Sequence, residues 1–167
     1  MGLGKTLQAI GLIDALRNSG SSPALVVSPA GLIGNWAREL GRFAPGFRIV
    51  VHHGGTRTQS LEGFQGADVV LTSYSTLARD IDWMSGCRFG VVIADEAQHI
   101  KNRRTLHAGA LRRLISSGRF LLTGTPIENS IEDAVALFDF VMPGYVAKPA
   151  GSGAERARDV GRLKDML

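Results

Sequence analysis

The first six residues, Met1 to Thr6, constrain the chain most, because two glycines precede a lysine and a threonine there. Gly2 and Gly4 can adopt backbone angles that other residues avoid, so the segment can curl with its N–H groups pointing inward. Its last three residues match the end of the pattern G-x-x-x-x-G-K-[ST]. In that pattern the lysine, here Lys5, reaches the phosphates of a nucleotide, and the hydroxyl, here that of Thr6, binds Mg²⁺.

This interpretation makes every residue of the segment a candidate ligand of phosphate. The candidates are Gly2, Leu3, Gly4, Lys5 and Thr6. The helix that follows would also present its N-terminal N–H groups to the anion. A glycine-rich terminal segment without a ligand is the alternative for so short a match. The first glycine of the pattern would precede Met1, so we expect residue 1 to be an internal start or a fragment boundary.

Composition indicates an ordinary globular domain, with 167 residues, 44% of them hydrophobic and 20% charged. No apolar segment approaches the roughly 20 residues that a membrane span needs, so no membrane partner is expected. Cys87 is the only cysteine, which excludes an internal disulfide and suits a reducing compartment. The net charge of +4 permits binding to a polyanion without requiring it. We therefore expect a cytoplasmic protein.

Short apolar segments alternate with amphipathic segments along the chain. The apolar segments predict strands at residues 24–28, 47–51, 68–72, 89–94 and 119–123. The amphipathic segments predict helices at residues 7–18, 32–43, 103–115 and 130–141. The predicted buried faces include Leu32, Trp36, Leu40 and Phe43 in the second helix, and Leu106, Ala110, Leu111 and Leu114 in the third. This alternation predicts an α/β domain with a mainly parallel sheet covered on both faces.

Two acids, Asp95 and Glu96, directly follow the apolar segment at 89–94. Ligands of open α/β sheets bind beyond the carboxyl ends of the strands, and carboxylates at the end of a buried strand need a positive partner. A nucleotide-bound Mg²⁺ ion would be such a partner. Asp95 would then hold the ion, mostly through its waters, and Glu96 would orient and deprotonate the attacking water. A solvated acidic turn that caps the next helix is the alternative.

Three segments together resemble motifs of superfamily-two helicases, in the form found in Snf-type, chromatin-remodeller-like DNA-dependent ATPases. They are residues 2–8 (GLGKTLQ), 95–102 (DEAQHIKN) and 122–129 (LTGTPIEN). Residues 28–36 resemble the family's motif Ia, residues 72–74 its motif Ib, and residues 137–144 its continuation after motif III. The resemblance covers residues 1 to about 146, and the order of the motifs is more specific than any single motif.

The resemblance implies a three-layer RecA-like P-loop NTPase lobe over residues 1–146, followed by a linker or tail at 147–167. It implies ATP and Mg²⁺ as ligands, and translocation along the backbone of double-stranded DNA. It also implies a protein associated with the nucleoid in the cytoplasm, or a nuclear one if the source is eukaryotic. Lys5, Asp95 and Glu96 match the catalytic positions. Residues that would link the nucleotide state to DNA contact are Gln98, Thr123, Gly124 and Thr125.

Four residues would lie near DNA phosphates if the resemblance holds: Ser28, Pro29, Thr72 and Ser73. Hydroxyls and loop N–H groups at strand ends are good phosphate ligands, and such contacts do not depend on the base sequence of the DNA. Ordinary capping at the ends of strands is the alternative for these residues, and Ser73 is also predicted to begin a helix. Trp36 is expected to be a core residue. The adjacent His52 and His53 have no further ligand cluster that would support a metal site.

The chain also departs from the family pattern. The family's ATPase contains two such lobes, and nothing after Gly144 resembles the second lobe or its arginine fingers. We therefore expect a second RecA-like lobe as a partner and very slow hydrolysis by the isolated chain. The strand that precedes the phosphate loop, which lies inside the family's sheet, is also missing. Its loss predicts unpaired backbone groups and exposed apolar surface on the neighbouring strands. A catalytically inactive remnant, which binds nucleotide weakly or binds only a partner lobe, is the alternative. A small-molecule kinase is a weaker one.

Overall fold

The computed structural model describes residues 4–18, 20, 22–55, 57–100, 105–124 and 131–143. The strands are β1 (Ala24–Ser28), β2 (Ile49–His52), β3 (Val69–Ser73), β4 (Arg88–Asp95) and β5 (Ile115–Leu122). The α-helices are α1 (Lys5–Asn18), α2 (Ile33–Phe43), α3 (Tyr74–Met84), α4 (Leu106–Arg113) and α5 (Ile131–Val141). Short 3₁₀ helices lie at η1 (Ala30–Leu32), η2 (Leu61–Phe64) and η3 (Ala97–Ile100).

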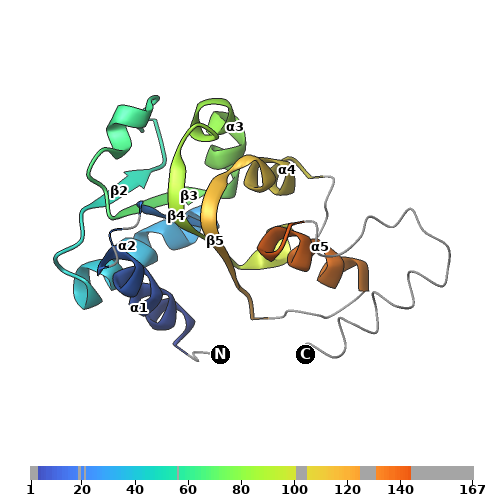
Figure 1. The fold of residues 1–167 in the computed structure, drawn as a ribbon, viewed down its shortest axis with the longest axis horizontal. Coiled ribbons are helices and arrows are strands. Elements are labelled where there is room, and N and C mark those ends of the chain that lie inside the picture. Colours follow the sequence, from blue (N-terminus) through green and yellow to red (C-terminus); the bar gives the residue numbers. More distant parts are fainter. Residues whose placement is uncertain are drawn as a thin grey trace.

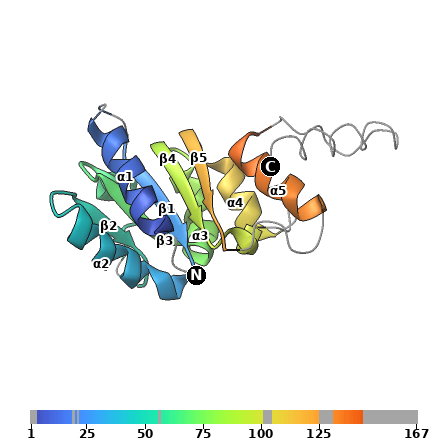
Figure 2. The same ribbon diagram turned by 90° about the horizontal axis from the view of Figure 1, so that it is seen from below.

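The strands form one parallel sheet in the order β2-β3-β1-β4-β5, with helices on both faces (Figures 1 and 2). Alternate side chains of β1 enter two different cores. Ala24 and Val26 pack with residues of α1 and α2, whereas Leu25 and Val27 pack with residues of α3, α4 and α5. Because both faces are covered, the inner strands β1, β3 and β4 are largely apolar and buried. The predicted three-layer α/β fold with a parallel sheet is therefore confirmed.

Element positions agree with the sequence prediction at the first four strands, and β1 has the predicted bounds. The predicted helix at 103–115 is wrong at its end, because α4 stops at Arg113 and β5 already begins at Ile115. The start of that helix prediction includes residues outside the described part. The first half of β5 was not predicted because it lacks a continuous apolar segment. It contains Ser116, Ser117 and Gly118. They form a strand because they pair with β4, beginning with Arg88 opposite Ile115.

Two side chains predicted to be buried are exposed, so those assignments were wrong. Phe43 is 43% exposed at the last position of α2, where its ring lies against the Arg42 guanidinium. Leu106 is 83% exposed because it is the first residue of α4, immediately after the N-cap Thr105. In contrast, Phe140 of α5 is buried although the sequence did not single it out.

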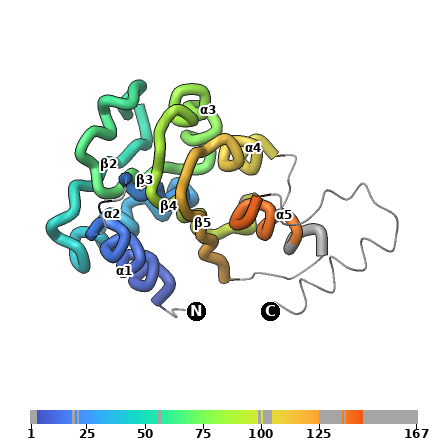
Figure 3. Tube along the Cα trace, in the orientation of Figure 1, coloured from blue at the N-terminus to red at the C-terminus, as the bar shows by residue number. Residues whose placement is uncertain are grey.

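The outer strands of the sheet carry exposed apolar side chains. They are Val51 in β2, and Ile115 and Phe120 in β5 (Figure 3 traces both strands). The prediction about the strand that precedes the family's phosphate loop concerns the chain before Gly4, which lies outside the described residues. Within the described part of the chain, no helix has both the length and the apolar character needed to cross a bilayer.

The contrast between two leucines of α4 gives a stability test. Leu111 is fully buried and Leu106 is exposed. We expect Leu111→Ala to lower the free energy of unfolding by about 2–5 kcal/mol, because a cavity remains in the core. Leu106→Ala should change it by less than about 0.5 kcal/mol. Urea unfolding of both variants measures the difference, and equal losses would contradict this placement of α4.

Candidate functional site at the carboxyl edge of the sheet

Three segments that are far apart in the sequence meet at the carboxyl edge of the sheet. Asp95, the last residue of β4, pairs in register with Leu122, the last residue of β5. Thr123 and Gly124 therefore leave the sheet beside Asp95. A Cβ atom built on Gly124 would lie 3.6 Å from Lys5 Nζ. The lysine at the start of α1 thus reaches the same edge as the acid pair, with its ammonium group beside Gly124.

The start of α1 has the backbone that a curled phosphate loop requires. Gly4 has a φ of +69°, in the left-handed region that favours glycine. Its carbonyl accepts a hydrogen bond of 2.9 Å from the Gln8 N–H in the first turn of the helix. Lys5 and Thr6 are partly exposed. Gly2 and Leu3 lie outside the described residues, as does Thr125.

Asp95 is nearly buried, with 9% of its surface exposed, and its polar atoms are closely held. The Trp36 indole N–H donates to Oδ2 at 2.8 Å, and the Glu96 backbone N–H donates to Oδ1 at 2.9 Å. The Tyr74 hydroxyl donates to the Asp95 carbonyl oxygen at 2.7 Å. Each carboxylate oxygen can accept more than one hydrogen bond, so both keep capacity for a metal ion or its waters.

The Tyr74 hydroxyl remains a donor at all ordinary pH values. Burial raises its pKa well above the usual range, and the negative charges of Asp95 and Glu96 raise it further. The sequence predicted a helix start here, and Ser73 is indeed the N-cap of α3, since its Oγ accepts from the Thr76 N–H at 3.2 Å. The contact between Tyr74 and Asp95 was not predicted.

Glu96 has an unusual backbone for a residue with a side chain. Its φ of +50° lies in the left-handed region, which costs of order 1–3 kcal/mol and is concentrated at functional sites. The Gln98 side-chain amide donates to Glu96 Oε2 at 2.9 Å. The strained turn thus places a second carboxylate, with its own donor, directly after Asp95. The predicted catalytic role of Glu96 and the coupling role of Gln98 stay predictions.

The hydroxyls predicted to face DNA are directed into the protein. Ser28, Thr72 and Ser73 are each at most 1% exposed. Thr72 Oγ1 donates to the His52 carbonyl at 2.9 Å, and Ser28 Oγ donates to the Pro29 carbonyl at 3.3 Å. The Thr72 bond links β3 to β2, and the Ser28 bond stays within its own chain segment. DNA contact by these two segments stays a prediction, for which their partly exposed Pro29 and the backbone are the available groups.

The two adjacent histidines have separate protein partners. His52 is fully buried, and its Nε2 lies 2.9 Å from Asp80 Oδ2, while Arg57 Nη2 donates to Asp80 Oδ1 at 3.0 Å. His53 Nδ1 lies 3.1 Å from Thr76 Oγ1. Burial lowers the pKa of His52 despite the opposing hydrogen bond and charge of Asp80. His52 is thus a neutral donor that ties the end of β2 to α3.

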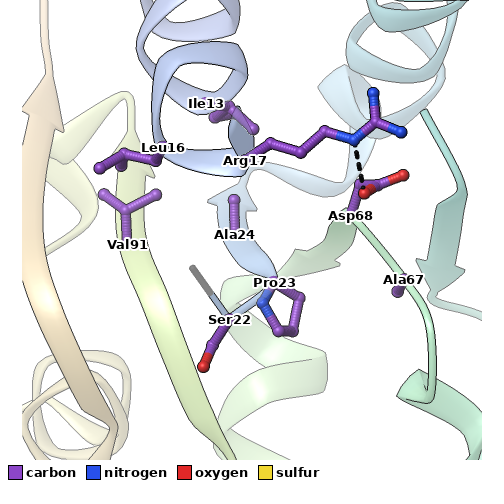
Figure 4. A pocket seen from close by; sticks show the side chains of 9 residues that line it. All are labelled: Ile13, Leu16, Arg17, Ser22, Pro23, Ala24, Ala67, Asp68 and Val91. Carbon is purple, nitrogen blue, oxygen red and sulfur yellow. Dashed lines mark hydrogen bonds and ion pairs between the residues drawn. The ribbon is translucent and has the colours of Figure 1, made fainter. Parts of the chain in front are cut away.

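A small cavity lies at the opposite, amino edge of the sheet (Figure 4). Its lining includes Ala24 at the start of β1 and Val91, four positions before Asp95 on β4. An ion pair of 2.8 Å between Arg17 Nε and Asp68 Oδ1 borders it. Asp68 also accepts from the Arg48 backbone N–H at 2.7 Å. Its position separates this cavity from the lysine and the acid pair, and its two charged lining residues, Arg17 and Asp68, are paired with each other.

Two aromatic residues of the site were missed by the sequence analysis. Trp36 was correctly expected in the core, since it is 2% exposed, but its contact with Asp95 was not foreseen. A signal was available, because a buried indole N–H or phenol usually needs a hydrogen-bond partner. The identity of that partner depends on strand order, which the sequence does not reveal directly.

A parallel α/β lobe with a lysine and an acid pair at one sheet edge has the architecture of a RecA-like P-loop NTPase lobe. The chain matches the SNF2-related domain over residues 1–151. It therefore belongs to the SNF2-related family, as the sequence motifs predicted.

Comparisons with curated proteins and solved structures agree with this assignment. The chain is 37% identical over 156 residues to the putative ATP-dependent helicase/translocase YwqA of Bacillus subtilis, covering 90% of this chain and 17% of that protein. It is 34% identical over 161 residues to the TATA-binding protein-associated factor MOT1 of Saccharomyces cerevisiae, covering 87% and 9%. The chain thus spans less than a fifth of these two relatives.

Two solved structures of the Sulfolobus solfataricus SWI2/SNF2 ATPase core have the same fold. The core in complex with double-stranded DNA aligns with a TM-score of 0.81 and 33% identity, covering 96% of this chain and 36% of that one. The core domain alone aligns with a TM-score of 0.76 and 35% identity, covering 100% and 35%.

The buried His52 predicts a pH dependence of stability. Its folded pKa lies below its ordinary value, so the unfolded chain binds more protons as the pH falls below about 6.5. We expect the free energy of unfolding to be highest above that pH and to decrease below it, by at most about 1.4 kcal/mol per pH unit for one proton. Urea unfolding between pH 7.5 and 5 measures the slope. His52→Gln should flatten it, whereas an unchanged slope would contradict the assignment.

Proposed function

We propose that this chain is the ATP-binding lobe of a DNA-dependent ATPase that translocates along double-stranded DNA. The observation that carries the proposal is the meeting of Lys5, Gly124 and Asp95 at one edge of the sheet. A cation, a loop glycine and a nearly buried carboxylate there suit a metal-bound triphosphate. The family membership supports the same activity.

The donor set at this edge fits ATP with Mg²⁺. Lys5 would contact the phosphates as a point charge, and the Thr6 hydroxyl and Asp95 would hold the ion. Bound Mg²⁺ would neutralise the charge that develops on the phosphates. Glu96 would accept a proton from the attacking water, and the Gln98 amide at 2.9 Å would fix the orientation of that carboxylate.

A DNA backbone is the partner that the neighbouring segments suit best. The Sulfolobus solfataricus SWI2/SNF2 ATPase core, which shares this fold, was solved in complex with double-stranded DNA. In this chain, the segments after β1 and β3 emerge at the same edge as Asp95, and their exposed residues include Ala30, Gly31 and Ser75. Backbone N–H groups and a serine hydroxyl there could contact phosphates, which would give affinity without base specificity.

Substitution of Lys5 tests nucleotide binding. We expect Lys5→Ala to weaken ATP binding at least tenfold, because a charge-assisted contact is lost. Isothermal titration calorimetry on the purified chain, with and without Mg²⁺, measures this. Arg17→Ala is the matched control, since it also removes a cation from α1, but at the opposite sheet edge. Equal ATP affinity in the Lys5→Ala variant and the unsubstituted chain would contradict the proposal.

Hydrolysis should require a second lobe. An arginine supplied across the cleft is worth roughly 10³–10⁵ in rate, so the chain alone should hydrolyse ATP very slowly. We expect a separately produced second lobe of an SNF2-related ATPase, added with double-stranded DNA, to stimulate phosphate release. Glu96→Gln should abolish the stimulation while leaving ATP binding intact. A folded chain that binds the lobe without any hydrolysis would support the inactive remnant instead.

A further inference from the structure

Asp95 is held from both faces of the sheet by aromatic side chains. Trp36 comes from α2, on the face that α1 shares, and Tyr74 comes from the start of α3 on the opposite face. Both are nearly buried, at 2% and 3% exposure. Trp36 contacts the carboxylate, with Nε1 2.8 Å from Oδ2, whereas Tyr74 contacts the main chain, with its hydroxyl 2.7 Å from the carbonyl oxygen. Of the two aromatic residues, Trp36 is therefore the one that contacts the carboxylate, the group that would face a metal ion.

The indole N–H limits how the carboxylate can rotate. Oδ1 is fixed by the N–H of the next residue, Glu96, at 2.9 Å, and Oδ2 is fixed by Trp36. One donor on each oxygen fixes the orientation of the carboxylate. The lone pairs that these two donors leave free stay available for a metal ion. Without the indole, Oδ2 would lose its partner in a nearly buried place, where an unpaired charged oxygen is unfavourable. The carboxylate would then turn toward water or another donor.

We propose that Trp36 is a positioning residue for the metal ion, which sets the affinity of Asp95 for Mg²⁺ through the hydrogen bond to Oδ2. The inference rests on the proposed function, because it concerns the same site. Hydrogen-bond partners of metal-binding carboxylates typically contribute 10- to 100-fold to metal affinity. Trp36 thus has a role beyond filling the core between α2 and the sheet.

The chain offers a matched test, because Trp36 and Trp83 are its two tryptophans. Trp83 packs against Phe64 and His52, with ring centroids 5.4 Å away in both cases. Trp36→Phe and Trp83→Phe remove the same atoms from packed positions, but only the first removes the donor to Asp95. We expect Trp36→Phe to lower Mg²⁺-dependent ATP affinity about tenfold or more. ATP affinity in EDTA should be unchanged in both variants, as should Mg²⁺-dependent affinity in Trp83→Phe.

Fluorescence provides a second readout, which does not require Trp36 to be replaced. In Trp83→Phe, Trp36 is the remaining tryptophan, and it donates to the carboxylate that would bind the ion. Adding Mg²⁺ to the ATP-bound chain should shift its emission, because the charge beside the indole N–H changes. Asp95→Asn in the same background should remove the shift. This measurement remains informative if Trp36→Phe folds poorly, which circular dichroism would reveal.

The outcomes separate this inference from the proposed function. An unsubstituted chain that folds and binds no ATP would overturn the proposed function and this inference with it. Mg²⁺-dependent binding that Trp36→Phe leaves unchanged would overturn the inference alone. So would a Trp36 emission spectrum that stays constant while calorimetry shows Mg²⁺ and ATP bound. Weaker Mg²⁺-dependent binding in Trp36→Phe, together with the emission shift, would support it.

Discussion

The arrangement of this lobe depends on one carboxylate that ends a buried strand. β4 is covered on both faces, and seven of its eight residues are buried, including Asp95. A charge in such a place is unfavourable unless donors or cations surround it. Trp36 and the Glu96 N–H supply donors to its two oxygens. The Tyr74 hydroxyl of α3, on the opposite face from Trp36, donates to the Asp95 carbonyl oxygen. Helices on both faces of the sheet therefore contact the residue that we propose binds the metal ion.

The parallel sheet brings the remaining groups to the same place. All strands point the same way, so each delivers its following segment to one edge. Lys5 reaches that edge from the start of α1 and lies near Gly124. The cavity bordered by Arg17 and Asp68 lies at the other edge, where the strands begin. The carboxyl edge of the parallel sheet therefore carries the candidate active site, whereas the ion pair of Arg17 and Asp68 lies at the amino edge.

Apolar strands and helix caps could be predicted from the sequence because short-range patterns determine them. β1 has its predicted bounds, and Ser73 caps α3 as expected. The start of β5 could not be predicted, because its polar residues become a strand only through pairing with β4. The contact between Trp36 and Asp95 spans 59 positions and depends on strand order. Motif resemblance located the candidate acids and the lysine, whereas the donors that fix the carboxylate required coordinates.

The most direct test of the site formed by Lys5, Thr6 and Asp95 is to locate a metal ion in it. A crystal of this chain with Mn²⁺ and a non-hydrolysable ATP analogue would give an anomalous scattering peak at the ion. We expect this peak between the Thr6 hydroxyl and the Asp95 carboxylate, with the terminal phosphate beside Lys5 Nζ. A nucleotide bound at the amino edge of the sheet, or a metal ion distant from Asp95, would contradict it.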